Sequence, residues 1–572
     1  MFDSKKENLF NANENREKKT SVIENPFIRE GMKNSARTKS GNYAEKYSTT
    51  GNDFIDQFGK LSEYKKQRSF SEISKDMSVL WAKDKELAVK LTFFMRTITR
   101  KVSLFDGTKT NTVQRGGGLK HESIMRMLWI YQKNHNIFWK NIPLFISIGS
   151  WKDIFQMLSY DLQFHGWDGR VLEWNEIFEL IASGLENQNT SDLVKKYLPQ
   201  IKSNKSCTTV ESQANNMIGK WIANKLFGSN DKASYVNYRK LKTSGDAHTW
   251  QQLISKGKFL EIDFNTVHGR ALAQLVSSKF LENQGLEKKF EKWILSKPTA
   301  KFTGFVHELF KPYAISSFGY FSKLKLKRYQ EYTIQKQFDG LVETAKKNAK
   351  TDTSLIVVRD TSASMLGSAH GYEDMACESI AKSLALFFSE MLPDGKFSNS
   401  WIEFNHDAKM HNWKGETVVE KWNNDETSTI GNTNFMSVIK LFCDIKRSGV
   451  NESEFPTGIL CISDGEFDPS SLNETNVEST FKALRTAGFS DDYVDNFKIV
   501  LWNLRNNYYG DRSGTKFETY GGKDKNVFYF SGYEASIIAF LTGLEHQEKE
   551  PKNAEELFYA AMDQEVLNMI II

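Results

Sequence analysis

Side chains that carry oxygen follow an apolar run in the second half of the chain. Residues 355–358 read Leu-Ile-Val-Val, and Asp360, Ser362 and Ser364 come directly after them. A short run of this kind, without proline and followed by a helical pattern, is typical of a buried parallel strand. Asp360 is therefore expected at the end of a strand, where open α/β sheets bind ligands. One carboxylate and two hydroxyls suit a hard divalent cation such as Mg²⁺. Taken alone, the same residues would also make an ordinary helix N-cap.

Two later segments favour the metal interpretation. Thr433 lies in the turn Gly-Asn-Thr-Asn-Phe, which opens onto an apolar helical pattern, and a second apolar strand at 458–462 ends next to Asp464. Two strand ends and one loop, in this order, can converge on a single ion. The sequence therefore predicts a Mg²⁺ site made of Asp360, Ser362, Ser364, Thr433 and Asp464.

The motif DTSAS at 360–364, with Thr433 and Asp464, resembles the metal-ion-dependent adhesion site of von Willebrand factor type A domains. The resemblance implies that the first four predicted ligands bind Mg²⁺ directly or through water, and that Asp464 acts mostly through water. Ala363 replaces the more usual glycine, and Arg359 stands where a small or apolar residue is common, but neither change removes a ligand. A Glu or Asp of a protein partner could complete the coordination of the ion.

The C-terminal part alternates strand and helix patterns, which predicts a doubly wound α/β domain over 351–545 and a helical tail over 546–572. Strands are expected at Leu355–Val358, Asn399–Phe404, Gly458–Ile462, Phe497–Leu501 and Val527–Phe530. Helices are expected at Met375–Met391, Phe435–Ile445, Glu478–Ala487 and Glu534–Leu544.

The N-terminal part has a different character. Residues 1–70 are polar and poor in aliphatic side chains, so an extended or disordered segment is expected. Residues 71–346 show repeated amphipathic helical patterns, which predict stacked helical hairpins of the HEAT-like kind, with an irregular solenoid or a compact bundle as alternatives. The expected helices are Val79–Ile98, Glu122–Tyr131, Ile154–Leu162, Trp174–Leu185, Ser191–Ile201, Asn215–Phe227, Val267–Glu282, Leu286–Leu295 and Phe302–Phe310.

Formal charge divides the chain into two unlike parts. Residues 351–572 hold 19 Lys and Arg against 35 Asp and Glu, a balance of −16, whereas residues 1–350 hold 57 against 36, a balance of +21. This asymmetry indicates a polyanionic partner for the front part, docking of the two parts on each other, or simply a solvated basic surface. Aromatic and basic residues alternate near 235–242 and 321–329, where Tyr235, Tyr238, Phe321 and Tyr329 could stack on single-stranded bases. The alternative is that these aromatic side chains belong to the core and that the lysines form a solvated surface. The candidate RNA-binding cations are Arg239, Lys240, Lys242, Lys323, Lys325, Lys327 and Arg328.

A wider resemblance covers nearly the whole chain. Segments such as YSTTGNDFIDQF at 47–58, QRGGGLKHESIMRMLWIYQKNH at 114–135, IGSWKDIFQML at 148–158 and the ILCISDGEFD strand end are similar to an uncharacterised family of plants and large DNA viruses. That family joins a helical region to a C-terminal von Willebrand A domain. More distantly, both parts and their order resemble Ro-type proteins, which carry a TROVE module. This resemblance implies a helical ring closed by the A domain and basic surfaces that bind RNA.

Other functional classes lack their signatures. The four cysteines are scattered without a CxxC pair, which argues against a zinc site and against a disulfide framework. Neither a signal peptide nor a membrane-spanning run is recognisable, so a cytoplasmic protein is expected. An Asp-x-Asp phosphatase motif, a Gly-x-Ser-x-Gly elbow and a P-loop are all missing. The glycines in QRGGGLK follow no strand, so a flexible connection is expected there rather than a phosphate loop.

The sequence therefore predicts a non-enzymatic RNA-binding scaffold with a Mg²⁺-dependent adhesion site. The alternative is a metal-dependent protein-interaction module that binds no nucleic acid. Salt-sensitive binding that survives chelation would favour the first function, and Mg²⁺-dependent capture of a protein would favour the second.

Overall fold

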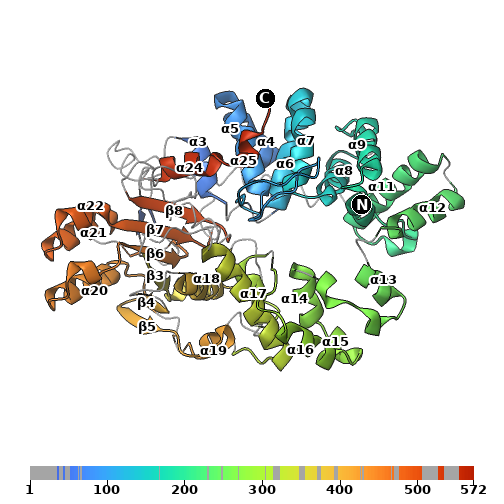
Figure 1. The fold of residues 1–572 in the computed structure, drawn as a ribbon. Coiled ribbons are helices and arrows are strands. Elements are labelled where there is room, and N and C mark those ends of the chain that lie inside the picture. Colours follow the sequence, from blue (N-terminus) through green and yellow to red (C-terminus); the bar gives the residue numbers. More distant parts are fainter. Residues whose placement is uncertain are drawn as a thin grey trace, which may run out of the picture.

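The computed structural model contains a helical half followed by an α/β half (Figure 1). It describes residues 35–37, 43–45, 52–61, 64, 67–166, 168–228, 231–245, 249–267, 269–302, 304–313, 323–346, 355–369, 375–391, 397, 399–425, 427, 431–465, 467–468, 476–505, 526–533 and 553–572. In the first segments, strand β1 (Ser35–Arg37) pairs antiparallel with β2 (Tyr43–Glu45).

The helices of the first half follow one another along an arc that runs from the top of Figure 1, around its right side, to the bottom. They are α3 (Asp53–Gly59), α4 (Phe70–Lys83), α5 (Lys85–Arg96), α6 (Lys120–Lys133), α7 (His135–Ile148), α8 (Trp151–His165), α9 (Trp174–Glu186), α10 (Ser191–Tyr197), α11 (Val210–Phe227), α12 (Lys232–Thr243), α13 (Thr249–Ser255), α14 (Gly269–Ser277), α15 (Phe280–Asn283), α16 (Glu287–Leu295) and α17 (Arg328–Lys346). Short 3₁₀ turns lie at Asn204–Ser206, Phe259–Glu261, Phe264–Thr266 and Val306–Leu309.

The second half is built on a six-stranded sheet in the order β5-β4-β3-β6-β7-β8. Its strands are β3 (Leu355–Asp360), β4 (Ser400–Phe404), β5 (Ala408–Asn412), β6 (Gly458–Ser463), β7 (Lys498–Asn503) and β8 (Val527–Ser531). All neighbours are parallel except β4 and β5, which are antiparallel. The helices are α18 (Cys377–Met391), α19 (Val418–Asn423), α20 (Met436–Arg447), α21 (Asn476–Thr486) and α22 (Asp491–Asn496), with 3₁₀ turns at Ala363–Leu366 and Glu452–Glu454.

Both faces of this sheet are covered because alternate residues of each strand point to opposite sides. On β3, Leu355 and Val357 join the core that contains α18, whereas Ile356 and Val358 join a second core that contains residues of α20 and α21. All residues of β3 and β6 are buried. The predicted doubly wound arrangement is therefore seen in the mixed six-stranded sheet.

Several predicted elements differ from the structure. The single helix expected at Val79–Ile98 is divided at Asp84, whose carboxylate accepts the amide hydrogen bond of Leu87 at 2.9 Å and begins α5 as an N-cap. The extended segment predicted at 1–70 contains α3, so the prediction is wrong for residues 53–59. The expected helix at Phe302–Phe310 is reduced to a 3₁₀ turn at Val306–Leu309.

Strand β5 and helices α7, α12, α13, α17, α19 and α22 are not among the elements expected from the sequence. The helix expected at Glu534–Leu544 lies outside the described residues. The HEAT-like stacking of the helical half stays a prediction.

The last helix of the arc contacts the α/β half. Phe338 of α17 packs against Phe387 of α18, with ring centroids 6.3 Å apart. The amide of Val418, at the start of α19, donates to the Gln335 side chain at 2.7 Å. Phe310 stacks on Trp422 of α19 at 4.4 Å. The chain thus passes from the helical half into the α/β half through a packed, largely aromatic contact.

The C-terminal tail returns to the first helices of the arc. Helices α24 (Ala554–Met562) and α25 (Glu565–Asn568) contact α5, and Phe558 packs against Phe58 of α3 at 5.5 Å. The Asn141 side chain bonds both the amide and the carbonyl of Ile571, at 2.9 and 2.6 Å. Since α24 also contacts β8, the α/β half is joined to both ends of the helical arc.

The glycine-rich segment after α5, residues 114–118, lies at the junction between the C-terminal tail and the first helices. The amides of Gly117 and Gly118 donate to the carbonyls of Phe94 and Thr97, each at 3.0 Å, and so satisfy the C-terminal end of α5. A Cβ atom on Gly116 would lie 2.1 Å from the Phe94 carbonyl oxygen, so no larger residue fits there. The prediction of a flexible connection is wrong, because residues 114–117 are buried.

We expect Gln564→Ala to weaken the junction of the tail. Gln564 accepts the amide hydrogen bond of Arg115 at 2.7 Å and donates to its carbonyl at 3.1 Å, both in a buried position. Leaving these backbone groups unpaired should lower the free energy of unfolding by about 1–3 kcal/mol in urea denaturation. Met569→Ala on the same tail, where the side chain is 39% exposed, should change it by less than about 0.5 kcal/mol. Equal losses in the two variants would contradict this account of the junction.

Candidate metal centre

The predicted metal ligands lie where the order of strands reverses in the sheet. From β3 the chain first adds β4 on one side and later places β6 on the other, so the crevice at the carboxyl ends of β3 and β6 is a switch point. Arg359 pairs with Ile462 in the register of these strands, which places Asp360 beside Ser463. The Ser463 hydroxyl donates to the Asp360 carboxylate at 2.5 Å, and Asp464 is the next residue in the sequence.

Four of the five predicted ligands are linked by hydrogen bonds. The Ser362 amide donates to Asp360 Oδ1 at 2.8 Å, which fixes the loop that leaves β3. The Ser362 and Ser364 hydroxyls are 2.9 Å apart, and the Ser364 hydroxyl donates to Asp464 Oδ1 at 3.4 Å. The structure therefore brings Asp360, Ser362, Ser364 and Asp464 into one cluster.

The fifth predicted ligand, Thr433, comes from the loop before α20. This loop contacts the first one, because the Ala363 amide donates to the Gly431 carbonyl at 3.2 Å. The Thr433 carbonyl accepts the Asp468 amide at 2.8 Å, and the residue is 3% exposed. Three loops thus meet at the crevice, in the order that the sequence predicts.

Two acidic groups in this cluster are shielded from water. Asp360 and Asp464 are both 0% exposed. Burial, and next the charge of Asp464, raises the pKa of Asp360 to about 7, although hydrogen bonds from Ser463 and Ser362 oppose the shift. Two carboxylates in such a position favour a positive charge beside them.

The sequence prediction had missed Arg505, which supplies part of that charge. Its guanidinium forms an ion pair with Asp464, with Nη1 at 3.1 Å from Oδ2, and it donates to the Ser364 carbonyl at 3.3 Å. Arg505 follows β7, the strand beside β6, so its place after a third strand end was the signal that could have revealed it. Ser463 had been missed as well, although it directly precedes Asp464.

The oxygen set fits a hard cation better than a soft one. It contains two carboxylates and the hydroxyls of serine and threonine, the kinds of ligand that Mg²⁺ takes together with water. No group of three or more His, Cys, Asp or Glu side chains suited to a metal occurs in the part of the chain that the structure describes. Any ion held here would therefore depend on Asp360, Asp464 and neighbouring hydroxyls.

Arg359, one residue before Asp360, points to the opposite side of the strand and is neutralised there. It pairs with Glu378 of α18 and with Asp425, where Nη1 is 2.6 Å from Oδ2. Lys382 of α18 also pairs with Asp425, at 3.1 Å. Arg359 also lies over the ring of Trp401, 5.1 Å from its centroid. This buried network occupies the position where the resemblance leads one to expect a small or apolar side chain.

The candidate RNA-binding cations fall into two groups. Arg239 and Lys240 on α12 are exposed, and so are Lys323 and Lys325. The Lys242 ammonium donates to the carbonyls of Lys196 and Leu198 at the end of α10, at 3.1 and 2.5 Å, and burial lowers its pKa to about 8. Its role there is that of a helix cap.

The remaining two cations pair with acidic residues. Lys327 lies 2.7 Å from Glu282 and 3.3 Å from Glu287, and Arg328 lies 3.3 Å from Glu291. Of the aromatic residues considered for base stacking, Tyr238 and Tyr329 are core residues, 0% and 2% exposed, so the core alternative holds for both. Tyr235 is partly buried, and Phe321 lies outside the described residues.

The model of a family described as a domain of unknown function (DUF7788) matches residues 354–568, a stretch that includes Asp360, Thr433 and Asp464. No curated protein matches. None of the helices described in the structure is both long and apolar enough to cross a membrane.

Two of the solved structures that match this chain have low similarity to it. The crystal structure of the RO (RSR) protein of Deinococcus radiodurans is 10% identical, with a TM-score of 0.32, over 91% of this chain and 95% of that one. An aerotolerance-related membrane protein from Bacteroides fragilis, carrying multiple mutations to serine, is 17% identical, with a TM-score of 0.21, over 33% of this chain and 94% of that one. At TM-scores this low, the matches do not establish fold or function here. The resemblance to a plant and viral family stays a prediction.

We expect Asp425→Asn to destabilise the fold in a pH-dependent way. Burial alone would raise the pKa of Asp425, but Arg359 and Lys382 lower it well below its usual value. A depressed folded-state pKa stabilises the protein above the unfolded pKa of about 4, and this contribution is lost as the pH falls below it. Near neutral pH, the variant should lose about 3–5 kcal/mol in the free energy of unfolding.

The difference between wild type and this variant should shrink as urea denaturation is repeated at successively lower pH. Asp444→Asn is a matched control, since its carboxylate is 52% exposed and pairs with Arg447 on the surface. That change should cost less than about 1 kcal/mol. If the loss of unfolding free energy in Asp425→Asn grew as the pH falls, the stabilising ion pairs assigned to Asp425 would be refuted.

Proposed function

We propose that this protein is a non-catalytic scaffold whose α/β half holds a divalent cation and captures a carboxylate of a protein partner. The observation that carries the proposal is the pair of fully buried carboxylates, Asp360 and Asp464. Asp360 accepts from the Ser362 amide, Asp464 accepts from the Ser364 hydroxyl, and the two serine hydroxyls are hydrogen-bonded to each other. The proposed ion is Mg²⁺, the proposed fifth ligand is Thr433, and the proposed location is the cytoplasm.

Electrostatics favours a cation at this place. Two neighbouring carboxylates removed from water repel each other, and the charge of a nearby cation offsets that cost. Arg505 already supplies one such charge beside Asp464. With Asp464 acting through water, Asp360 is the carboxylate that binds the proposed ion directly, so the ion keeps net positive charge and an incoming Glu or Asp is an appropriate further ligand.

Removing Asp360 tests the cation site directly. Asp360→Ala should lower Mg²⁺ affinity at least about a hundredfold in isothermal titration calorimetry, because even outer-shell changes cost 10–100-fold in metal affinity. Asp407→Ala removes an exposed carboxylate from the loop between β4 and β5 and should leave the titration unchanged. Equal Mg²⁺ affinity in wild type and Asp360→Ala would end the proposal of a cation site.

RNA binding by the helical half is the second candidate function. Its support is the formal charge of +21 over residues 1–350, together with the exposure of Arg239, Lys240, Lys323 and Lys325. Cations of this kind contact phosphates and make nucleic-acid affinity strongly dependent on salt. The same scaffold can carry both functions, since the basic residues and the proposed cation site lie on different halves.

Two double variants separate free from paired cations near α17. Lys323→Gln/Lys325→Gln should lower the affinity for a single-stranded RNA oligomer and reduce the salt slope by about two, since each phosphate contact contributes about one. Lys327→Gln/Arg328→Gln removes equal charge from residues already paired with Glu282, Glu287 and Glu291, so a smaller change is expected. The readout is filter binding across a salt series. Unchanged slopes in both variants would exclude this segment from RNA binding.

A further inference from the structure

Strand β5 is the outer strand of the sheet, and the bonds at the two ends of its hairpin with β4 fix which backbone groups point outward. The Trp413 amide donates to the Asn399 carbonyl at 3.0 Å, and the Asn405 amide donates to the Asp407 carbonyl at 3.1 Å. Bonded and non-bonded pairs alternate along an antiparallel ladder, so in this register the odd-numbered residues of β5 bond β4. The N–H and C=O groups of residues 408, 410 and 412 therefore point to the outer edge of the sheet.

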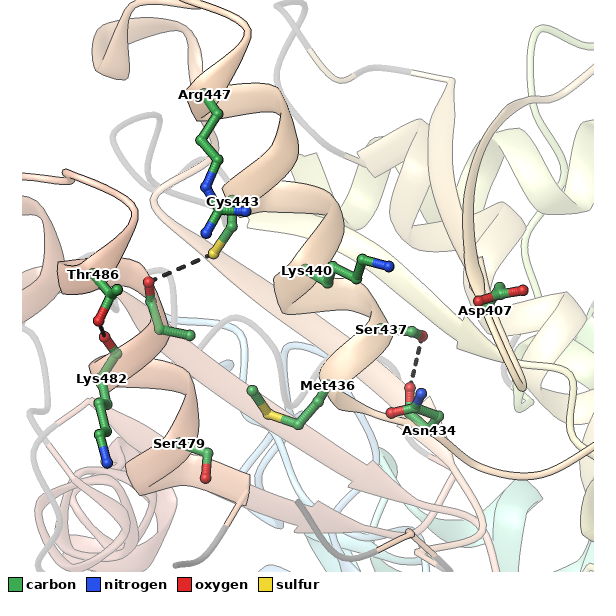
Figure 2. Close-up of a pocket in the computed structure, with 11 residues that line it drawn as sticks. Asp407, Asn434, Met436, Ser437, Lys440, Cys443, Arg447, Ser479, Lys482 and Thr486 are labelled. Carbon is green, nitrogen blue, oxygen red and sulfur yellow. Dashed lines mark hydrogen bonds between the residues drawn. The ribbon is translucent and has the colours of Figure 1, made fainter. Parts of the chain in front are cut away.

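The two faces of β5 have different surroundings. Ala408 packs against the core that contains α20, and Asp407 of the preceding turn lines a pocket on α20 together with Lys440 (Figure 2). Because side chains alternate along a strand, Lys409 and His411 lie on the face opposite to Ala408. They line a second pocket of about 420 Å³, formed by residues of β4, of β5 and of the segment that follows α19. This second pocket therefore lies beside the outer edge of the sheet.

The two acidic side chains in this second pocket already have partners. His411 Nε2 lies 2.7 Å from Glu403 Oε2, and the Thr361 hydroxyl donates to Glu403 Oε1 at 3.1 Å. Asp425 is held by Arg359 and by a lysine of α18, as described above. These carboxylates are therefore engaged within the protein.

The basic side chains of the second pocket are available to a ligand. Lys409 and Lys414 are both exposed, and neither pairs with an acidic group in the part of the chain that the structure describes. A strand added to β5 would bring its own side chains close to Lys409 on this face, because cross-strand neighbours are in contact. Opposite charges stabilise such pairs and like charges destabilise them. The edge therefore favours an incoming strand with acidic residues on the face of the pocket.

We propose that β5 binds an extended segment of a partner protein in which acidic residues alternate with β-branched apolar residues. The segment adds a strand to the sheet through the outward backbone groups, and its acidic side chains reach Lys409 and Lys414. On the other face, Met410 is 45% exposed, and valine side chains of the segment would cover it. A second copy of this chain fits less well, because two paired β5 strands bring lysine beside lysine or histidine. The site is independent of the cation site, since none of the five predicted metal ligands lines this pocket.

The test uses the full chain and a fluorescein-labelled decapeptide of alternating Glu and Val, measured by fluorescence anisotropy in chelator. The chelator removes any contribution of a cation-bound carboxylate. Met410→Pro removes an outward N–H and obstructs the incoming strand without removing a bond to β4, so it should weaken binding at least about tenfold. Met410→Thr keeps the N–H and suits a strand, so it should lose less.

A charge variant tests the same edge with the backbone of β5 unchanged. Lys409→Gln/Lys414→Gln should weaken binding about tenfold, because two surface ion pairs are lost. Lys288→Gln/Lys292→Gln removes equal charge from exposed residues of α16 in the helical half and should bind like wild type. In wild type, the bound peptide should also slow hydrogen exchange of residues 408–412, measured by mass spectrometry.

Several results would overturn the proposal. These are no peptide binding to wild type, equal affinity in wild type and Met410→Pro, or unchanged hydrogen exchange over residues 408–412. An equal loss in Lys288→Gln/Lys292→Gln would also overturn it, because the effect would then be one of overall charge. Wild-type dimers in analytical ultracentrifugation that Met410→Pro abolishes, without peptide binding, would assign the edge to a second copy instead. Peptide binding that is lost only in the β5 variants supports the proposal, whatever the response of the protein to Mg²⁺.

Discussion

The burial of two carboxylates at the ends of adjacent strands is the constraint to which the α/β half is adapted. Parallel pairing of β3 with β6 places Asp360 beside Ser463 and Asp464, and the surrounding loops exclude water from both acids. Such a pair is stable only when hydrogen bonds and positive charge surround it. Ser463, the Ser362 amide and Arg505 supply three of these interactions from three strand ends. The loops are thus arranged around two buried acidic residues whose positions are set by the pairing of β3 with β6.

Strand β3 also buries a positively charged side chain, Arg359, on its other face. Because side chains alternate along β3, Arg359 and Asp360 point in opposite directions although they are neighbours in sequence. Arg359 is neutralised by Glu378 and Asp425, so its charge does not have to be shared with Asp360. The two buried charges of β3 therefore belong to separate networks. The helix α18, which carries Glu378, also anchors the strand that ends in the candidate metal centre.

The sequence predicted local features well and distant contacts poorly. The apolar strands β3 and β6, and the acidic residues at their ends, follow from short patterns, and four predicted ligands do cluster. Strand β5 was missed because it lies at the edge of the sheet and its residues are partly or fully exposed, so it has no apolar pattern. The role of QRGGG was missed because its partner, Gln564, lies about 450 positions away in sequence. The sequence left Tyr238 and Tyr329 open between base stacking and the core, because basic neighbours do not reveal the direction of an aromatic ring.

The two halves of the molecule cannot be regarded as independent modules. One continuous apolar core includes residues of α5, α6 and α8 in the helical half, Leu355, Val357 and the α18 side chains in the α/β half, and Phe558 of the tail. The sheet face that carries Arg359 is covered by α18, and α18 in turn packs on α17. The face that carries Ile356 is covered by α20 and α21 of its own half. The metal-site loops thus lie at the end of a sheet with one face packed on the helical arc and the other covered by helices of its own half.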